Sequence, residues 1–409
     1  MEAPRRQWIL PRADVKLAKL RFMNFWHDIP KPIIGLSPMD GVTDASFRWI
    51  AARHGGPDIT VTEFTNVDAA IHAPHTLIRD FTYSEIERPV IAQIYGNKPE
   101  LFYKAAHVVC ELGFDGVDIN MGCPAKNVAA SGSGAALIRT PELARAIIQH
   151  TRQGIADWVA GQTLDSLGLR QRLRETVKTS NEQRSGWATP PLRQPIPLSV
   201  KTRIGYDKIT IDDWIANLLE EKPVAISIHG RTLKQGYKGD ADWDAIARAV
   251  EIAGPTPTLI LGNGDLRGMD DIYRRVRQCG VDGVLLGRAA EGNPWIFRAK
   301  SQLKQALRDS TPPVPSEPIA LAERFKVIVE HSHHFENYVQ ERNFVGMRKH
   351  LIWYCRDFRG AAELRTKMVR VNGTVDVMQC LRDYEAWLEM QRLPASVARQ
   401  SEPSPLAVP

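Results

Sequence analysis

The residue of this sequence best suited to acid–base chemistry is Cys123, in the turn Asn120-Met-Gly-Cys-Pro-Ala-Lys directly after a short apolar segment. An unperturbed thiol has a pKa of about 8.5, so it is mostly protonated near pH 7 and can act as a general acid. The other cysteines are interpreted as packing residues, namely Cys110, Cys279, Cys355 and Cys380. Because no CxxC or Cys/His pair has zinc spacing, we expect neither a disulfide framework nor a metal site.

Eight short, β-branched apolar runs alternate with helical stretches between residues 33 and 288, and each is predicted to be a strand. They span 33–37, 59–64, 90–95, 116–120, 198–202, 224–229, 258–262 and 283–287. Eight alternating strands and helices predict an α/β fold of the (β/α)8 TIM barrel type. A doubly wound sheet is the competing fold, but it usually has fewer strands and a glycine fingerprint after the first, where this chain has Ser37-Pro38-Met39-Asp40.

Polar residues follow nearly every predicted strand, and in a TIM barrel the active site lies at these carboxyl ends. Capping or turn formation could account for one or two of them, but not easily for eight. The sequence therefore predicts a polar site at one end of the barrel. The strand ends supply Ser37 with Pro38 and Met39, Glu63, Gln93, Asn120, Lys201 with Arg203, His229 with Arg231, Asn263 with Asp265, and Gly287 with Arg288.

The last two strand ends, Gly262-Asn-Gly-Asp and Leu286-Gly-Arg, combine small residues with backbone N–H groups where barrels commonly bind phosphate. The other ends offer amide, ammonium and imidazole groups, which suit the heteroatom edge of a flavin and the negative charge that it carries when reduced. We therefore expect FMN as the cofactor. The lack of a separate dinucleotide fingerprint favours FMN over FAD.

Composition divides the 409-residue chain into five expected parts. Residues 309–318 are rich in proline and predict an extended linker, and residues 319–393 contain no proline and have apolar residues at helical spacing. The expected parts are an N-terminal extension at 1–30, the barrel at 31–308 with a polar, Arg-rich insertion at 154–196, the linker at 309–318, a helical domain at 319–393 and a disordered tail at 394–409.

No apolar run approaches the roughly 20 residues that a membrane span needs, so we expect no membrane association. Charged residues interrupt the first thirty positions, which is unlike a secretory signal, and we expect a cytoplasmic protein. The net charge of +6 is modest for this length and suggests an anionic partner only if it is concentrated in one region.

The positive charge is concentrated in one stretch of the expected helical domain, residues 342–370. Eight cations face two acids in this stretch, an excess of six that equals the net charge of the chain, and Trp353, Tyr354 and Phe358 lie among them. A solvated helix face is the ordinary explanation, but the interleaved aromatic residues favour binding to an RNA backbone, with Arg356, Arg359 and Lys367 as candidate contacts. The eight cations are Arg342, Arg348, Lys349, Arg356, Arg359, Arg365, Lys367 and Arg370, and the two acids are Asp357 and Glu363.

These motifs together resemble the tRNA-dihydrouridine synthase family, in its bacterial form. The likeness covers about residues 31–300 strongly and the helical domain more loosely, and it departs from the family pattern at Asp40 and at the insertion. The matching segments are Ser37-Pro-Met-Asp-Gly-Val-Thr-Asp, Gln93-Ile-Tyr-Gly, Asn120-Met-Gly-Cys-Pro, Lys201-Thr-Arg-Ile-Gly, His229-Gly-Arg-Thr, Gly236-Tyr-Lys-Gly-Asp-Ala-Asp-Trp, Gly262-Asn-Gly-Asp and Gly287-Arg.

The resemblance implies an FMN barrel joined to a tRNA-binding domain, which reduces a uridine of tRNA with NADPH as the reductant. Hydride would add to C6 of an extruded uracil while Cys123 donates the proton to C5. Asn120 and Arg203 would face the uracil, and we count Arg231 as a further substrate contact. By position, FMN would be held by Pro38, Met39, Asp40, Gln93, Lys201, His229, Asn263, Gly264, Asp265, Gly287 and Arg288.

Two other functions stay open at the level of sequence. A small-molecule FMN barrel of the dihydroorotate dehydrogenase type would share the fold and the flavin, but it has no need of a basic helical domain. A binding module that has lost catalysis would not need the intact Cys123 or the full set of flavin positions.

Overall fold

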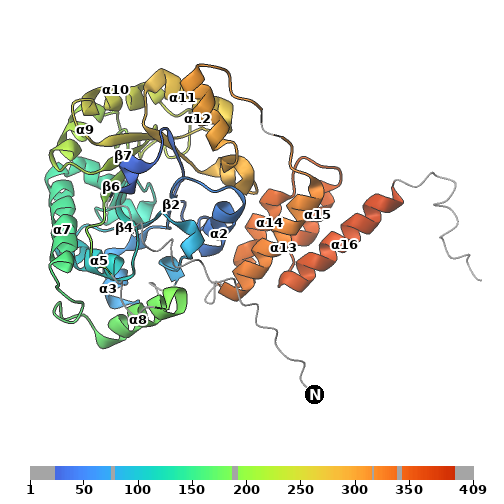
Figure 1. The fold of residues 1–409 in the computed structure, drawn as a ribbon, viewed down its shortest axis with the longest axis horizontal. Coiled ribbons are helices and arrows are strands. Elements are labelled where there is room, and N and C mark those ends of the chain that lie inside the picture. Colours follow the sequence, from blue (N-terminus) through green and yellow to red (C-terminus); the bar gives the residue numbers. More distant parts are fainter. Residues whose placement is uncertain (1–23, 75–78, 187–191, 316, 339–342, 392–409) are drawn as a thin grey trace, which may run out of the picture.

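The structure is a computed structural model that describes residues 24–74, 79–186, 192–315, 317–338 and 343–391 of the chain. A ring of parallel strands surrounded by helices forms the larger body, and four helices, α13 to α16, lie beside it (Figure 1). The expected tail at 394–409, most of the expected extension at 1–30 and Arg342 fall outside the described residues. None of the described helices combines the length and apolar character needed to cross a membrane.

All strand pairs of the sheet are parallel, and the order is β1-β9-β8-β7-β6-β5-β4-β2, with β3 also on β4. Two backbone hydrogen bonds join β1 to the segment entering β2, Leu36 N to Ile59 O at 3.0 Å and Asp58 N to Ile34 O at 2.9 Å, and so close the ring. The predicted TIM barrel is confirmed. The strands are β1 Ile33–Leu36, β2 Thr60–Val61, β3 Thr65–Asn66, β4 Val90–Tyr95, β5 Gly116–Met121, β6 Leu198–Arg203, β7 Ala225–His229, β8 Leu259–Asn263 and β9 Gly283–Leu286.

Helices follow the strands and cover the outside of the ring (Figure 1). Those of the barrel are α1 Phe25–Asp28, α2 Ala45–His54, α3 Val67–His72, α5 Pro99–Glu111, α6 Lys126–Ala130, α7 Pro141–Val159, α8 Gln171–Ser185, α9 Ile211–Glu220, α10 Trp243–Ala253, α11 Met269–Cys279 and α12 Lys300–Asp309. Short 3-10 turns are η2 Glu85–Glu87, η3 Gly134–Arg139, η4 Arg288–Ala290, η5 Pro294–Phe297 and η6 Phe344–Met347.

Of the second predicted strand, 59–64, only Thr60–Val61 forms a strand, β2, and a second short strand, β3, follows at Thr65–Asn66. The side chain of Thr62 causes the break, because its hydroxyl oxygen accepts the N–H of Gln93 at 3.0 Å in place of a backbone carbonyl. Glu63 lies in the gap and is buried, and its carboxylate accepts the N–H of Gly41 at 2.6 Å. Glu63 therefore anchors the loop after β1.

The amino ends of the strands are sealed by α1. Phe25 and Trp26 are buried with Ile33, Ile59 and Leu285 in one apolar cluster inside the barrel. The last residues of the expected N-terminal extension thus belong to the barrel core, and ligands can reach the interior from the carboxyl ends.

The expected insertion at 154–196 begins inside a barrel helix, because α7 continues to Val159. Gly154 lets α7 approach α5, since a Cβ there would lie 2.4 Å from the carbonyl oxygen of Tyr103. The additional helix α8 packs on the end of α5, where the Asn181 amide donates to Glu111 O at 2.7 Å. The carboxyl ends of barrel helices lie at the amino ends of the strands, so the Arg-rich α8 is at the opposite end of the barrel from the expected site.

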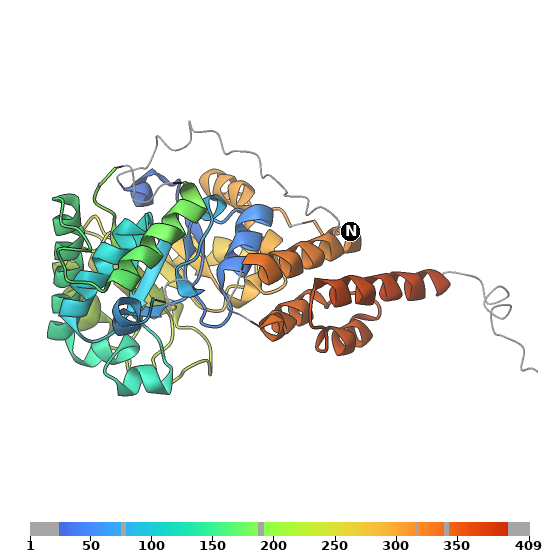
Figure 2. The same ribbon diagram turned by 90° about the horizontal axis from the view of Figure 1, so that it is seen from below.

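Helices α13 Leu321–Tyr338, α14 Arg348–Tyr354, α15 Ala361–Met368 and α16 Thr374–Met390 form the expected helical region and share a second apolar core. Helix α13 lies along α2, where Glu330 pairs with Arg53 and His54, and the Ser46 hydroxyl lies 3.0 Å from His334 Nδ1. Figure 2 shows α16 on the side away from the barrel. Between α12 and α13 the described residues of the expected linker form no helix or strand.

A buried ion pair joins α2 to η2. The Arg48 guanidinium donates to Glu87 at 2.7 Å, and both side chains are about 1% exposed. Its remaining donors reach the carbonyl oxygens of Thr43 and Thr82 at 2.8 and 2.5 Å. This guanidinium fixes the loop after β1, which carries three of the expected flavin contacts.

We expect Glu87→Ala to lower the free energy of unfolding by about 3–5 kcal/mol, because it leaves the Arg48 charge buried without a counter-ion. Glu323→Ala is the control, since Glu323 pairs with Arg298 at the surface and should contribute at most about 1 kcal/mol. Urea unfolding followed by circular dichroism measures both values. Equal losses would contradict a special role for the buried pair.

Candidate active site

One cavity of about 1150 Å³ opens at the carboxyl ends of the strands. It brings together all eleven positions expected to contact FMN, and Cys123, Asn120, Arg203, Arg231 and Arg356 also line it. Seven cations and four carboxylates are among the lining residues. The excess of positive charge favours an anionic ligand.

The loops after β8 and β9 form the most polar wall of this cavity. Gly264 has φ +126° and Asp265 has φ +52°, so the backbone turns back on itself after β8. A Cβ at Gly264 would lie 2.7 Å from the Ala241 Cβ and 3.1 Å from His229 Cδ2, which leaves room for glycine alone. This compact turn beside Gly287 and Arg288 has the chemistry of a phosphate cradle.

Asp265 organises the cations beside this turn. Its carboxylate accepts from Arg231 at 2.6 Å, from Arg288 at 3.2 Å and from the Ala241 N–H at 2.7 Å. Burial raises the pKa of Asp265, but the hydrogen bonds from Arg231 and Ala241 outweigh it and hold the pKa below its usual value. Asp265 is therefore ionised at neutral pH and holds both guanidinium groups.

Lys201 places an ammonium group deep in the cavity. Its Nζ lies 3.4 Å from Asn263 Oδ1, which is a weak hydrogen bond. Burial, with repulsion by Arg203, lowers the pKa of Lys201 to about 8, although the charge of Asp118 acts in the opposite direction. Lys201 is still mostly protonated near pH 7, and an anionic ligand group would compensate its charge.

His229 is neutral in this environment. Burial and then the nearby cations, first Arg203, lower the pKa of His229 far below its usual range. Its Nε2 lies 3.3 Å from Nη1 of Arg231, and because a guanidinium can only donate, Nε2 is the acceptor. The proton of the His229 ring therefore lies on Nδ1.

Cys123 lines the cavity, and the residue is 8% exposed. Burial raises the pKa of Cys123, so the thiol is protonated at neutral pH and can donate a proton. The Asn120 side chain holds its loop, because Oδ1 accepts the N–H groups of Gly122 and Cys123 at 3.0 and 2.8 Å.

Arg203 has a role that the sequence did not predict. Its guanidinium is buried and donates to the carbonyl oxygens of Gly122 at 2.7 Å, Thr232 at 3.1 Å and Gly236 at 3.2 Å. It therefore ties the Cys123 loop to the loop after β7, and it also reaches the cavity wall. Arg231 similarly donates to the carbonyl oxygen of Gly239.

The three candidate RNA contacts differ in position. Arg356 lines the cavity from the helical region and donates to Glu291 O at 2.9 Å. Arg359 and Lys367 are exposed and lie outside the cavity lining, and Arg359 also contacts the Trp387 ring and Gln391. The cavity thus borders the helical region at Arg356.

Several lining residues were not predicted as site residues, among them Phe64, Lys126 and Tyr237. Tyr237 is 67% exposed on the loop after β7, and the Arg288 guanidinium lies 6.0 Å from its ring centroid. Its segment, Gly236-Tyr-Lys-Gly, was part of the resemblance, so a large aromatic residue in a turn was an available signal.

The donor set fits an anionic flavin. A glycine turn can receive a phosphate group, and Lys201 and Gln93 can contact a heteroatom edge deeper in the barrel. Among the described residues, no group of three His, Cys, Asp or Glu side chains could hold a metal ion.

A family model described as dihydrouridine synthase matches residues 35–164 and 192–390. A probable tRNA-dihydrouridine synthase of Staphylococcus aureus is 32% identical over 374 residues, which cover 90% of this chain and 97% of that protein. Probable tRNA-dihydrouridine synthase 2 of Bacillus subtilis is 31% identical over 369 residues, with coverage of 88% and 97%. The unmatched residues 165–191 include α8.

Among solved structures, DHODH in complex with ferulenol from Eimeria tenella has a TM-score of 0.43 and 14% identity, covering 69% of this chain and 82% of that one. Histamine dehydrogenase from Rhizobium sp. 4-9 has a TM-score of 0.41 and 14% identity, with coverage of 68% and 46%.

We expect Gly264→Ala to destabilise the flavin-free protein by about 1–3 kcal/mol, because alanine rarely adopts its positive φ and the added methyl would meet Ala241. Gly268→Ala is the matched control, since no atom lies within 4 Å of its Cβ position and its backbone is extended. Urea unfolding compares the two variants. A loss as large in Gly268→Ala would contradict the constraint at Gly264.

Proposed function

The chain belongs to the dihydrouridine synthase family, and we propose that it reduces the C5=C6 bond of a uridine in tRNA with a bound FMN, which NADPH re-reduces. The observation that carries this proposal is the convergence of all expected flavin positions and Cys123 on one cavity that borders the helical region. The cytoplasm, where tRNA is available, is the proposed location.

When bound, FMN supplies the hydride that adds to C6 of the uracil ring. Gly264, Asp265, Gly287 and Arg288 would hold its phosphate, and Lys201 would face the negative charge of its reduced ring. The remaining contacts would come from Pro38, Met39, Asp40, Gln93, His229 and Asn263.

Cys123 would protonate C5 after hydride addition. Its raised pKa keeps the proton on sulfur until negative charge develops on the uracil. Asn120 keeps the thiol loop in place through two N–H groups, and Arg203 holds the same loop from the other side through Gly122 O. A stacked base cannot reach this cavity, so the uridine must be extruded from the tRNA.

The helical region would bind the tRNA backbone. Arg356 lies at the boundary with the cavity, and Arg359 and Lys367 are exposed in the same helical region but outside the cavity lining. The family match continues to residue 390, through this region. That extent supports tRNA over the alternative of a small-molecule flavin barrel, which has no need of such a region.

The purified protein should be yellow and contain about one FMN per chain, because the cavity offers a glycine turn that can bind phosphate and an excess of positive charge. Flavin absorbance and chromatography of the released cofactor measure this. Arg288→Glu should lose the flavin, since it sets a carboxylate against the phosphate. A colourless protein that takes up no FMN on reconstitution would contradict the proposal.

Cys123→Ala should bind FMN and tRNA and be reduced by NADPH at the wild-type rate, yet reduce uridine about 10² to 10⁴-fold more slowly, because the acid at C5 is lost. Single-turnover assays of dihydrouridine formation measure the effect. Cys279→Ala is the control, since this buried cysteine lies outside the cavity lining. Wild-type turnover of Cys123→Ala would show that another group is the acid.

Replacing Arg356, Arg359 and Lys367 with alanine should weaken tRNA binding and reduce the slope of log affinity against log salt by about two, since each phosphate contact contributes roughly 0.7 to 0.9. Flavin content should stay unchanged. The matched control replaces Arg170, Arg172 and Lys178 with alanine. These changes remove the same charge from the exposed surface in and beside α8, at the other end of the barrel. Equal slope changes in both variants would contradict a specific RNA surface.

A further inference from the structure

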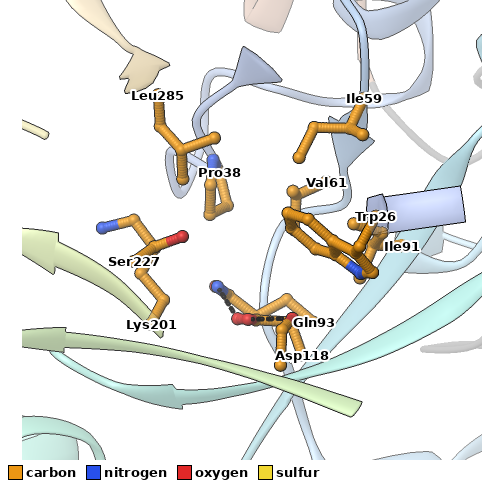
Figure 3. A pocket seen from close by; sticks show the side chains of 11 residues that line it. Trp26, Pro38, Ile59, Val61, Ile91, Gln93, Asp118, Lys201, Ser227 and Leu285 are labelled. Atoms are coloured by element: carbon orange, nitrogen blue, oxygen red, sulfur yellow. Dashed lines mark hydrogen bonds between the residues drawn. The ribbon is translucent and has the colours of Figure 1, made fainter. Parts of the chain in front are cut away.

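Asp118 is a buried carboxylate in the interior of the barrel, below the cavity floor. It is 4% exposed and lies in the middle of β5, between the apolar residues Val117 and Ile119. Figure 3 shows it facing Gln93, with Lys201 on the other side of a small internal cavity. It is absent from the lining of the large cavity, so it would contact neither flavin nor uracil there.

A chain of hydrogen bonds leads from Asp118 to the loop of the proposed acid. Gln93 Nε2 donates to Asp118 Oδ2 at 2.7 Å, and Asn120 Nδ2 donates to Gln93 Oε1 at 2.9 Å. Asn120 Oδ1 then accepts from the N–H groups of Gly122 and Cys123. On its other side, Asp118 Oδ1 accepts from the Ser199 hydroxyl at 2.6 Å.

The direction of this chain follows from the chemistry of its first member. An ionised carboxylate has no proton to donate, so Gln93 must turn its NH₂ group toward Asp118. The Gln93 oxygen then accepts from the Asn120 NH₂ group, and the Asn120 oxygen accepts from the two backbone N–H groups. The two backbone N–H groups can only donate, so they favour the same orientation of Asn120 from the other end of the chain. Without the carboxylate at position 118, these N–H groups alone would hold the orientation of the two amides.

We propose that Asp118 is a positioning residue whose carboxylate fixes the orientation of Gln93 and Asn120 and thereby holds the Cys123 loop in place for proton donation. The mechanistic meaning of this inference rests on the proposed function, in which Cys123 is the acid. The hydrogen-bond chain itself belongs to the protein without any ligand.

The protonation state of Asp118 agrees with this role. Burial raises the pKa of Asp118 to about 6, although hydrogen bonds from Ser199 and Gln93 and the charge of Lys201 act in the opposite direction. The group is therefore ionised near pH 7. Lys201 is the charged group that faces it from β6, while Ser227 of β7 and Trp26 of α1 contribute neutral groups to the same internal cavity.

A second role for Asp118 is to balance the charge of Lys201. Removing the carboxylate alone would disturb both roles, so the test must restore the chain without restoring the charge at position 118. The double variant D118N/N120D does this by reversing the chain. The new amide at position 118 can donate to Gln93 Oε1, and Gln93 Nε2 can donate to the new carboxylate at position 120. That carboxylate can still accept from the loop N–H groups.

The experiment measures alkylation of Cys123 by iodoacetamide in the flavin-free protein, for wild type, D118N, N120D and D118N/N120D. Peptide mapping follows each cysteine separately, and Cys380 on α16 is the internal reference. The limiting rate constant is taken from the full pH profile, so that a change in the thiol pKa is separated from a change in exposure. Ser199→Ala is the matched control, because it removes a partner of Asp118 without altering the direction of the chain.

In N120D, carboxylates at positions 118 and 120 both face the Gln93 amide, and its NH₂ group can donate to only one of them. The Cys123 loop should therefore loosen, and the limiting alkylation rate of Cys123 should rise on the order of tenfold. D118N alone should change it less, since Gln93 can still donate to the amide oxygen at position 118. The alkylation rate of the double variant should return to within about threefold of the wild-type rate. The rate of Ser199→Ala should lie within the same range. Melting temperatures should show the same rescue if N120D folds poorly.

The proposal would be overturned if the fold-change of the alkylation rate in D118N/N120D equalled the product of the fold-changes in the two single variants. An unchanged alkylation rate in N120D would also overturn it. Because the readout needs neither flavin nor tRNA, these outcomes are distinct from a failure of the proposed function, which appears as missing FMN or missing dihydrouridine.

Discussion

Closure of the parallel ring is the constraint on which the site depends. The hydrogen bonds of β1 to β9 on one side and to the segment entering β2 on the other leave no free edge in the sheet. Because every strand runs in the same direction, residues from 37 to 288 reach a single rim. The cavity is therefore a product of topology, since none of the loops that line it could form it alone.

The concentration of charge at that rim conflicts with stability. Lys201, Arg203, Arg231 and Arg288 lie around one cavity, and burial lowers the pKa of the first two to about 8 and about 10. Arg203 and Arg231 are held by loop carbonyl oxygens, whereas Lys201 has a weak contact with Asn263 and is balanced in part by the charge of Asp118. A bound anion, such as the proposed flavin, would compensate the remaining positive charge.

The helical region is fixed against the same rim by several contacts of different kinds. Lys349 of α14 donates to the carbonyl oxygen of Gly41, in the loop after β1, and Arg356 donates to Glu291 after β9. Behind them, burial lowers the pKa of His334 to about 4, so this histidine is neutral where α13 meets Ser46 of α2. The surface proposed for tRNA thus has a defined position relative to Cys123.

The sequence by itself determined the barrel and its rim, because strand periodicity, turn residues and polar strand ends are local signals. Gln93, Cys123, Lys201 and Asp265 could be selected from such signals, and they do line one cavity. The tertiary structure alone decided features that depend on contacts between distant segments. Thr62 divides the second strand through a hydrogen bond to β4, Arg203 joins two loops through carbonyl oxygens, and Asp118 directs amides on two strands. A side chain in a strand has a fixed face but no fixed partner, and its partners are set only when the ring closes.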